Sequence, residues 1–358
     1  MDLTKDLVKA AVYGGAVLGG GGGGWIDSGI HMGNMAVEYG HLRLLNADEL
    51  SPGCTVITAS AVGAPAAEDR YLKPENYVRS VELLIDAMGS GIEGIITNEN
   101  GASATVNGWL QAAVLGIPVV DAPCNGRAHP ISSMGSMGLA KMADYVSIQA
   151  ASGGNPKQGR NLEMVVKGDV KHCGNIVRKA AVEAGGVVAV ARNPVTVKFA
   201  LENGAPGAIS QAIEVGKIML ESEIKGPEEM INGAVQVLKG NIVTSGEVEF
   251  FEIQTEGGFD VGRVTVKDGS DRYHMTFWNE YMTLEKDGER LGTFPDLIMT
   301  LSSDTGLPVT TAEIGKGKNI TIITAHKNNL ILGSAMFDKE LYIPLENAVG
   351  KKIIEHVF

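Results

Sequence analysis

The chain has 358 residues, of which 44% are hydrophobic and 20% are charged, a balance typical of folded globular proteins and not of disordered ones. Its formal net charge of -12 argues against a nucleic-acid backbone or an anionic membrane surface as the main partner. The length exceeds that at which a single hydrophobic core usually keeps growing, so we expect two domains.

The cysteines and the N-terminal residues indicate a cellular location. Cys54, Cys124 and Cys173 show no CxxC spacing and form no even disulfide framework, which favours reduced thiols. The first residues lack the basic and apolar regions of a signal peptide, and no apolar run reaches the ~18–20 residues that a membrane span needs. We therefore expect a cytoplasmic protein.

The first two-thirds of the chain alternate helical and strand-like patterns. Apolar residues at helical spacing predict helices over residues 3–18, 25–39, 74–88, 107–115, 173–184, 195–202 and 208–221, with Asp27 or Ser28 as N-cap of the second. Short apolar runs predict strands over residues 43–45, 55–59, 94–97, 118–121, 164–167 and 186–191. This alternation predicts an α/β domain over residues 1–240, with a mostly parallel sheet between helical layers.

Near residue 240 the pattern changes to short, alternating segments such as 248–253, 262–266 and 273–278. Turn signals, including Asp-Gly at 268–269 and 287–288, separate them and continue to the end. The pattern predicts a smaller, antiparallel all-β domain over residues 241–358. Because no low-complexity linker separates the two domains, we expect a tight interface.

Six consecutive glycines, Gly19 to Gly24, separate the first two predicted helices. The backbone N–H groups of Gly21, Gly22, Gly23 and Gly24 could line a ligand, because no Cβ atoms shield them. The alternative is a tight crossover, where the backbone passes close to another element. No Lys-Ser/Thr follows as in a Walker A loop, and the preceding helix does not fit a dinucleotide fingerprint.

The segment 121–130 brings together several reactive side chains just after a predicted strand, where ligands bind in open α/β sheets. Cys124 could be a nucleophile or a soft metal ligand if Arg127 or His129 favours its thiolate. His129 could be a base or a ligand. Alternatively, Asp121 is a cap that pairs with Arg127, and Cys124 is a small buried hydrophobic residue.

A second polar segment, 97–105, follows the predicted strand 94–97. Its small side chains leave room for a substrate near Asn98, and Glu99 could act as an acid, a base or a ligand. The alternative is an ordinary helix N-terminus capped by Ser103 or Thr105. The turn at 61–65 could close the same cleft.

The predicted β domain carries two polar pairs beside apolar strands, Asn279-Glu280 and Pro295-Asp296. They are either turn or interface residues, or they close the cleft from the second domain. Lone histidines are expected at the surface or as caps: His31, His41 and His172.

Short motifs spread over nearly the whole chain carry a family resemblance. Besides the glycine run they are Val-Gly-Ala-Pro at 62–65, Gly-Ile-Pro-Val-Val-Asp-Ala at 116–122, Gly-Arg-Ala-X-Pro at 126–130, Phe-Trp-Asn-Glu at 277–280, Phe-Pro-Asp-Leu-Ile at 294–298 and Thr-Gly-Leu-Pro-Val at 305–309. In order and spacing they resemble the S-methyl-thiohydantoin desulfurase family, whose members lie near hydantoinase and oxoprolinase genes.

The resemblance implies an α/β domain with a β domain, and hydrolytic chemistry on a five-membered cyclic amide or its sulfur analogue. This chain departs from the family pattern at three places. Where Glu-X-Gly-Gly-X-Asn-Ser is expected, residues 99–105 keep Glu99 but lose the Asn. Residues 122–125 read Ala-Pro-Cys-Asn, and His129 replaces an aromatic residue. All three departures lie in the expected pocket, so the family's substrate does not carry over directly.

Our leading hypothesis is a hydrolase or desulfurase acting on a small cyclic amide or thioamide. Glu99, Asp121, Cys124 and His129 would activate water. In one version a divalent metal such as zinc is held by the last three, because a catalytic zinc uses three protein ligands and one open position. Arg127 and the amides of the glycine run would hold an anionic group of the substrate. In a metal-free version, Cys124 is the nucleophile and His129 its base.

Two rival interpretations stay open at this point. The chain could be a non-catalytic or regulatory subunit of a hydantoinase-type complex, or a nucleotide-binding protein that uses the glycine run. In each case we expect a small-molecule ligand, no nucleic-acid or membrane partner, and a homo-oligomer. The enzyme hypothesis requires that the glycine run and the loops at Glu99 and Asp121 meet at one crevice.

Overall fold

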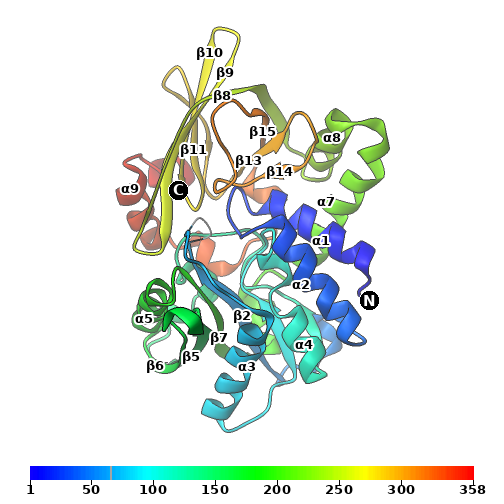
Figure 1. The fold of residues 1–358 in the computed structure, drawn as a ribbon, viewed down its shortest axis with the longest axis vertical. Helices are drawn as coiled ribbons and strands as arrows, with labels where there is room; N and C mark the ends of the chain where they lie inside the picture. The colour runs from blue at the N-terminus through cyan, green and yellow to red at the C-terminus, as the bar shows by residue number, and fades with distance from the viewer. Residues whose placement is uncertain (65–66) are drawn as a thin grey trace.

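Two β-sheets organise the chain in the computed structural model, which describes residues 1–64 and 67–358 (Figure 1). The first sheet lies among helices and the second is antiparallel, so the predicted combination of an α/β domain and an all-β domain is confirmed. The turn expected at 61–65 falls partly outside the described residues. Within those residues, no helix combines the length and apolarity needed to cross a lipid bilayer.

The first sheet has seven strands, in the order β1-β4-β3-β2-β7-β5-β6. They are β1 (Leu44–Asn46), β2 (Thr55–Gly63), β3 (Gly94–Thr97), β4 (Val119–Asp121), β5 (Ser147–Gly153), β6 (Leu162–Gly168) and β7 (Val187–Thr196). The first four strands in this order pair in parallel, whereas β7, β5 and β6 pair antiparallel. The sheet is therefore mixed. The pattern did not predict β5, which is joined to β6 by a short connection, and such a connection permits only antiparallel pairing.

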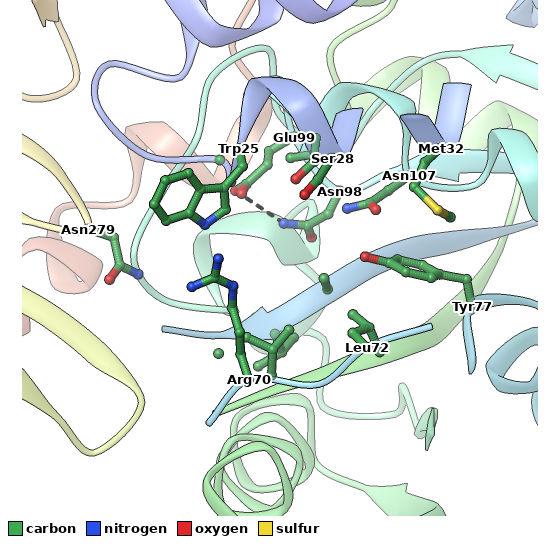
Figure 2. Close-up of a pocket in the computed structure, with 18 of the residues that line it drawn as sticks. Trp25, Ser28, Met32, Arg70, Leu72, Tyr77, Asn98, Glu99, Asn107 and Asn279 are labelled. Atoms are coloured by element: carbon green, nitrogen blue, oxygen red, sulfur yellow. Dashed lines mark hydrogen bonds between the residues drawn. The ribbon is translucent and has the colours of Figure 1, made fainter. Parts of the chain in front are cut away.

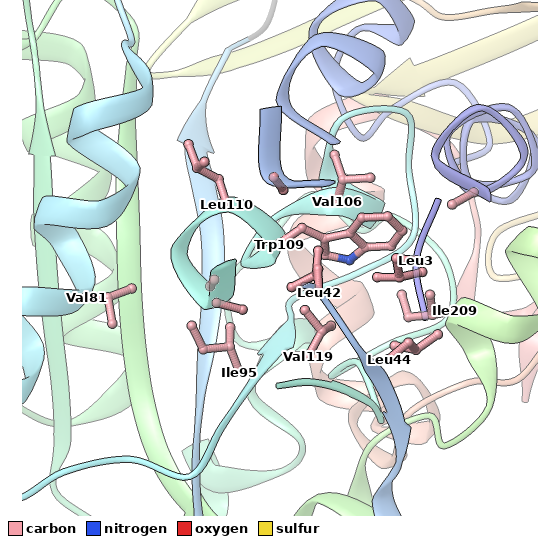
Figure 3. Packing of buried hydrophobic residues seen from close by; sticks show 14 of the residues in the cluster. Leu3, Leu42, Leu44, Val81, Ile95, Val106, Trp109, Leu110, Val119 and Ile209 are labelled. Carbon is pink, nitrogen blue, oxygen red and sulfur yellow. The ribbon is translucent and has the colours of Figure 1, made fainter. Parts of the chain in front are cut away.

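Helices cover both faces of this sheet, as the alternation predicted. They are α1 (Lys5–Leu18), α2 (Ile26–Tyr39), α3 (Pro74–Met88), α4 (Trp109–Leu115), α5 (Val170–Glu183), α6 (Val197–Asn203) and α7 (Ala208–Ser222). Ile57, Ile95 and Val119 point to one face, where they pack with α1, α3 and Trp109 of α4 (Figure 3). Their chain neighbours point to the other face, toward α6, because side chains alternate along a strand.

The second sheet has eight strands, all antiparallel, in the order β12-β11-β10-β9-β8-β15-β13-β14. They are β8 (Asn241–Glu256), β9 (Phe259–Asp268), β10 (Asp271–Trp278), β11 (Glu280–Lys286), β12 (Glu289–Thr293), β13 (Leu297–Ser302), β14 (Pro308–Val309) and β15 (Asn319–Ala325).

Three local predictions were wrong. The chain does not remain β-rich to its end, because α9 (Ile343–Val349) and α10 (Ile354–Val357) follow the last strand. A helix that the pattern did not predict, α8 (Pro227–Val237), precedes the second sheet, and Pro227 stands in its first turn, a position that proline favours. The N-cap of α2 is Trp25, so Asp27 and Ser28 lie inside the helix. The negative charge of Asp27 in the first turn interacts favourably with the positive end of the helix dipole.

A shared hydrophobic core joins the two domains. It contains Val17 and Leu18 of α1, together with buried side chains of α7, α8, β13 and β15. Helices α1 and α7 touch at their backbones: a Cβ on Gly14 would lie 1.8 Å from the carbonyl oxygen of Ala212. Helix α1 therefore ends against the second sheet, and the glycine run begins at the domain interface.

Candidate active site

A cavity of about 360 Å³ lies where the first sheet meets the second domain (Figure 2). Gly23 and Gly24 at the end of the glycine run line it, as do Glu99 and His129 from the loops after β3 and β4. The second domain contributes residues from the junction between β10 and β11. The three segments that the enzyme hypothesis requires to meet therefore do meet at one crevice.

Parallel pairing of two loops brings Glu99 and His129 together. Beyond the ends of β3 and β4 the chain continues the ladder: the Cys124 N–H donates to Thr97 O (3.0 Å), and the Asn125 N–H donates to Asn98 O (3.1 Å). Glu99 and Asn125 form an isolated parallel bridge. Both loops thus leave the same edge of the sheet side by side, as expected for neighbouring parallel strands.

Glu99, His129 and Asn98 form a compact polar cluster at the cavity. The Glu99 Oε2 atom accepts hydrogen bonds from the backbone N–H of His129 (3.2 Å) and from Nδ2 of Asn98 (3.3 Å, dashed in Figure 2). The same oxygen lies 3.1 Å from Nε2 of His129, which is also 3.1 Å from Nδ2 of Asn98. Arg192 donates from Nη2 to Oδ1 of Asn98 (2.7 Å), which orients the amide with its NH2 group toward the other two residues.

Burial shifts the acid–base properties of this cluster in opposite directions. Burial raises the pKa of Glu99 to about 7, against smaller opposing effects of its hydrogen bond from His129 and the charges of Arg192 and Arg178. Burial, then the charge of Arg192, lowers the pKa of His129 to about 3. At neutral pH His129 is therefore an uncharged imidazole, and Glu99 is poised to gain or lose a proton.

The second domain supplies a second carboxyl group, that of Glu280. Glu280 is 2% exposed, lines the cavity, and among the described residues no group hydrogen-bonds to its Oε2. Burial, then the charge of Glu99, raises its pKa well above the usual value. The preceding residue, Asn279, has a left-handed backbone conformation with φ of 57°. Its Oδ1 accepts a hydrogen bond from the Asp260 N–H at 2.9 Å, which fixes the conformation of the junction between β10 and β11. Of the two alternatives for Asn279-Glu280, closure of the cleft is the one observed.

Most of the glycine run is a packed crossover between the domains. The Gly20 and Gly21 carbonyl oxygens accept hydrogen bonds from the N–H groups of Tyr281 (2.8 Å) and Thr311 (2.9 Å). A Cβ on Gly22 would lie 2.0 Å from Oε1 of Glu280, and one on Gly21 would contact the side chain of Thr311 at 2.8 Å. Gly21 and Gly22 therefore lie against the second domain, and it is Gly23 and Gly24 that reach the cavity wall.

Asp121 caps a helix instead of facing the cavity. Its Oδ1 accepts from the Ile209 N–H (2.8 Å), and its Oδ2 accepts from the N–H and Oγ of Ser210 (3.1 and 2.6 Å). These groups belong to the first turn of α7, whose exposed N–H groups and positive dipole end suit a carboxylate. The alternative interpretation of Asp121 as a cap is the one observed, although its partner is α7 and not Arg127.

Cys124 is fully buried beside Thr58, with 3.2 Å between its Sγ and the Thr58 Oγ1. It belongs to the apolar cluster on the face of the sheet toward α6. Burial raises the pKa of its thiol to about 11, so the thiolate that a nucleophile or metal ligand requires is disfavoured.

Arg127 is also fully buried, at the domain interface and not on the cavity wall. Its Nη1 donates to the carbonyl oxygens of Pro295 (2.8 Å) and Asp296 (2.7 Å), and its guanidinium lies 4.4 Å from the ring centroid of Phe294. Burial lowers its pKa to about 10. Arg127 thus fixes the segment around Pro295-Asp296, which serves the interface and not the cleft.

Comparison with known proteins assigns the chain to a family. The model of the S-Me-THD-like N-terminal domain matches residues 6–159, and that of the S-Me-THD-like C-terminal domain matches residues 168–335. The chain belongs to the S-Me-THD-like family. None of the curated proteins matches it. The crystal structure of a protein from Chromobacterium violaceum is similar in fold, with a TM-score of 0.73, 19% sequence identity and 97% of each chain covered.

The residues of this S-Me-THD-like chain do not fit the predicted metal site. Of the predicted ligands, only His129 lines the cavity, whereas Asp121 points to α7 and Cys124 lies in an apolar cluster. Across residues 1–64 and 67–358, no group of three or more His, Cys, Asp or Glu side chains is placed to hold a metal ion. We therefore derive no step through a metal.

Several cavity residues were missed by the sequence analysis. They are mainly cationic or aromatic: Arg70, Lys73, Tyr77, Arg178 and Arg192. A signal existed for Arg192, because an arginine inside a buried apolar strand rarely occurs without a partner. Arg178 lies on a helix with an ordinary polar face, which gave no such signal. His31, expected at the surface or as a cap, also lines the cavity.

Proposed function

We propose that this S-Me-THD-like protein is a hydrolase or desulfurase that adds water to a small five-membered cyclic amide or thioamide, of the hydantoin or thiohydantoin kind. The main support is the Glu99 carboxyl group, whose pKa is raised to about 7 beside an uncharged imidazole in a cavity. A general base is most effective when its pKa lies near the working pH. Family membership supports the thiohydantoin-related substrate class.

In the proposed reaction, ionised Glu99 takes a proton from a water molecule whose oxygen attacks an sp² carbon of the ring. Uncharged His129 and the NH2 group of Asn98 surround the Glu99 oxygen and orient it. The guanidinium of Arg192, hydrogen-bonded to Asn98, contributes positive charge that stabilises the negative charge developing on the tetrahedral intermediate.

The intermediate then collapses by one of two bond cleavages. In a cyclic amide the C–N bond breaks, and the ring nitrogen receives the proton held by Glu99, giving the ring-opened acid. In an S-methylated thiohydantoin the proton of the added hydroxyl group passes to the ring nitrogen as a new carbonyl group forms, and the C–S bond breaks so that methanethiol leaves with the proton held by Glu99. In 2-thiohydantoin the sulfur leaves as hydrogen sulfide, which takes both the proton held by Glu99 and the hydroxyl proton. In both cases Glu99 returns to its ionised form.

The size of the cavity agrees with a small substrate. Ligand pockets commonly measure ~300–1,000 Å³, and about 360 Å³ lies at the lower end of that range. Trp25 and Tyr77 give the walls flat aromatic surfaces (Figure 2), which suit a planar five-membered ring.

The test is turnover of hydantoin, 2-thiohydantoin and S-methylated thiohydantoin by the purified protein. Ring opening is followed by mass spectrometry, and sulfur release by a thiol reagent. The wild-type protein should turn over at least one compound, and Glu99→Gln should lower the rate about 10²–10⁴-fold. Glu228→Gln, on the exposed side of α8, makes the same chemical change outside the cavity and should keep the rate. Absence of turnover, or turnover that survives Glu99→Gln, would refute the proposal.

A further inference from the structure

The cavity is rich in positive charge although the chain is strongly acidic. Arg70 and Lys73 line it where it meets solvent, and the less exposed Arg178 and Arg192 line it further in. Within the described part of the chain, its acidic lining residues are Glu99 and Glu280. Local charge in a cleft, and not the net charge of the chain, decides which ligands are attracted.

Arg192 is a buried cation whose described partners are neutral. It is 2% exposed, and its Nη2 donates to Oδ1 of Asn98 at 2.7 Å. Among the described residues, no group hydrogen-bonds to its buried Nε. Burying a charge without an opposite charge and full hydrogen bonding is costly, so buried guanidinium groups normally have an anionic partner.

Arg178 repeats this arrangement on the neighbouring wall. Its Nη1 donates to Gly258 O at 2.7 Å, and its guanidinium lies 4.0 Å from the ring centroid of Phe259. These contacts orient the side chain without neutralising its charge. Arg178 and Arg192 line the same cavity, and burial, then the charge of Arg192, lowers the pKa of Arg178 to about 10.

The two cavity carboxyl groups do not balance this charge. Burial raises the pKa of Glu99 to about 7 and that of Glu280 well above its usual value, so both carboxyl groups hold their protons to a higher pH than exposed ones and offset less of the positive charge. An anion between Arg178 and Arg192 would neutralise the positive charge of both guanidinium groups. A carboxylate supplies one negative charge that is shared by two oxygens, which suits a pair of guanidinium groups.

We propose that the ligand of this cavity carries a carboxylate group, which Arg178 and Arg192 bind while Arg70 and Lys73 attract it at the entrance. Together with the proposed function, on which this inference rests, it defines the substrate class as five-membered cyclic amides or thioamides bearing a carboxylate substituent. Planar guanidinium groups match the geometry of a carboxylate.

The experiment compares the binding of hydantoin-5-acetic acid with that of its uncharged amide by titration calorimetry and thermal shift at pH 7.5. The acid should bind wild-type protein roughly tenfold or more tightly than the amide. Arg178→Gln should remove most of this preference. Arg263→Gln, which removes an equal charge from an exposed position on β9, should keep it. If Arg178→Gln does not fold, Lys73→Gln at the exposed entrance should reduce the preference about two- to threefold, and an unchanged preference would count against the inference.

Each outcome decides the inference. Equal affinities for acid and amide overturn it, as does a preference that survives Arg178→Gln. If neither ring compound binds, succinamate, which carries one carboxylate, and the uncharged succinamide are compared in the same assay. Equal or absent binding of these two, or stronger binding of inorganic phosphate, also overturns it. Because binding is measured without turnover, loss of the proposed reaction and loss of carboxylate preference are separate results.

Discussion

The Oε2 atom of Glu99 lies 3.1 Å from Nε2 of His129, and both atoms face the NH2 group of Asn98. In isolation a glutamate carboxyl group has a lower pKa than an imidazole. Burial reverses this order here, so the Glu99 carboxyl group keeps its proton to a higher pH than the His129 imidazole does. Environments that invert two titrating neighbours in this way are typical of acid–base catalysis. In the proposed reaction, the imidazole is therefore an uncharged orienting group and the carboxyl group is the base.

The first prediction concerns the pH dependence of the reaction. Since Glu99 must be ionised to accept a proton from water, kcat/KM should rise with pH through about 7 and then level off. His129, with a pKa of about 3, should contribute no step above pH 5. A rate that falls as pH rises through 7 would mean that Glu99 acts as a protonated acid.

The second prediction concerns the pH dependence of stability. Burial raises the pKa of Glu99 in the folded state above its usual 4.5, so its stabilising contribution is complete below pH 4.5 and is lost as pH rises through about 7. Glu99→Gln lacks this loss. Its free energy of unfolding relative to wild type should therefore increase from pH 4.5 to pH 7, by up to about 3 kcal/mol, and then stay constant.

The stability comparison is made by urea denaturation at several pH values. His129 contributes an opposite slope below pH 6.5, because burial lowers its pKa, but both proteins contain it, so its effect largely cancels in the difference. Glu228→Gln should stay within about 0.5 kcal/mol of wild type throughout. A difference for Glu99→Gln that does not change with pH would show that Glu99 is not protonated on folding.

The third prediction distinguishes a buried thiol from a nucleophile. Cys124 is fully buried against Thr58, and burial raises its pKa to about 11. Cys124→Ala should keep turnover within about threefold of wild type and cost ~1–2 kcal/mol of stability through the lost contacts. Turnover is measured below the melting temperature of the variant. A loss of a hundredfold or more in folded protein would restore Cys124 as the nucleophile.

The sequence predicted most elements whose signals are local. The bounds of α3 match the prediction because Pro74 begins the helix and Gly89 ends it in the left-handed conformation. The strand β5 was missed because its small residues, in Ser147–Gly153, show neither alternation nor a long apolar run. Its antiparallel pairing with β7 depends on contacts distant in sequence, which no local pattern encodes.

The site was predictable only where it follows a strand end. Asn98, Glu99 and His129 belong to loops that parallel strands bring to one edge, and those loops do meet. Side-chain direction was not predictable, because Asp121 could turn either to the cavity or to the start of α7. The contributions of Glu280 and Arg178 depend on how the second domain and α5 pack around the cleft, which requires the tertiary structure.

The fourth prediction tests the glycine run as a crossover that positions Glu280. A Cβ on Gly22 would lie 2.0 Å from Oε1 and 2.6 Å from Cδ of the buried Glu280, which would have to move. Gly22→Ala should cost ~1–3 kcal/mol of stability, as overpacking does, and should lower turnover in the protein that remains folded. Gly315→Ala, at a loop position with no atom within 4 Å of the new Cβ, is the matched control. Equal behaviour of the two variants would contradict the packed crossover.

The fifth prediction separates the structural role of Asp121 from a catalytic one. Asp121 accepts three hydrogen bonds from Ile209 and Ser210 at the start of α7, and α7 packs directly on α1. Asp121→Ala leaves those donors without their acceptor, so the free energy of unfolding should fall by ~1–3 kcal/mol. Turnover of the folded fraction, measured at low temperature, should stay within about twofold of wild type.

Asp121→Asn provides the comparison for this last prediction. It keeps one side-chain carbonyl oxygen as an acceptor for the first turn of α7 but removes the negative charge that favours the helix dipole. Its stability should therefore lie between those of Asp121→Ala and the wild type, with turnover again unchanged. If both variants instead keep wild-type stability and lose turnover, the carboxylate takes part in the reaction, and the cleft must open toward α7. The order of stabilities, and not the loss alone, thus identifies Asp121 as the residue that fixes the start of α7 to the end of β4.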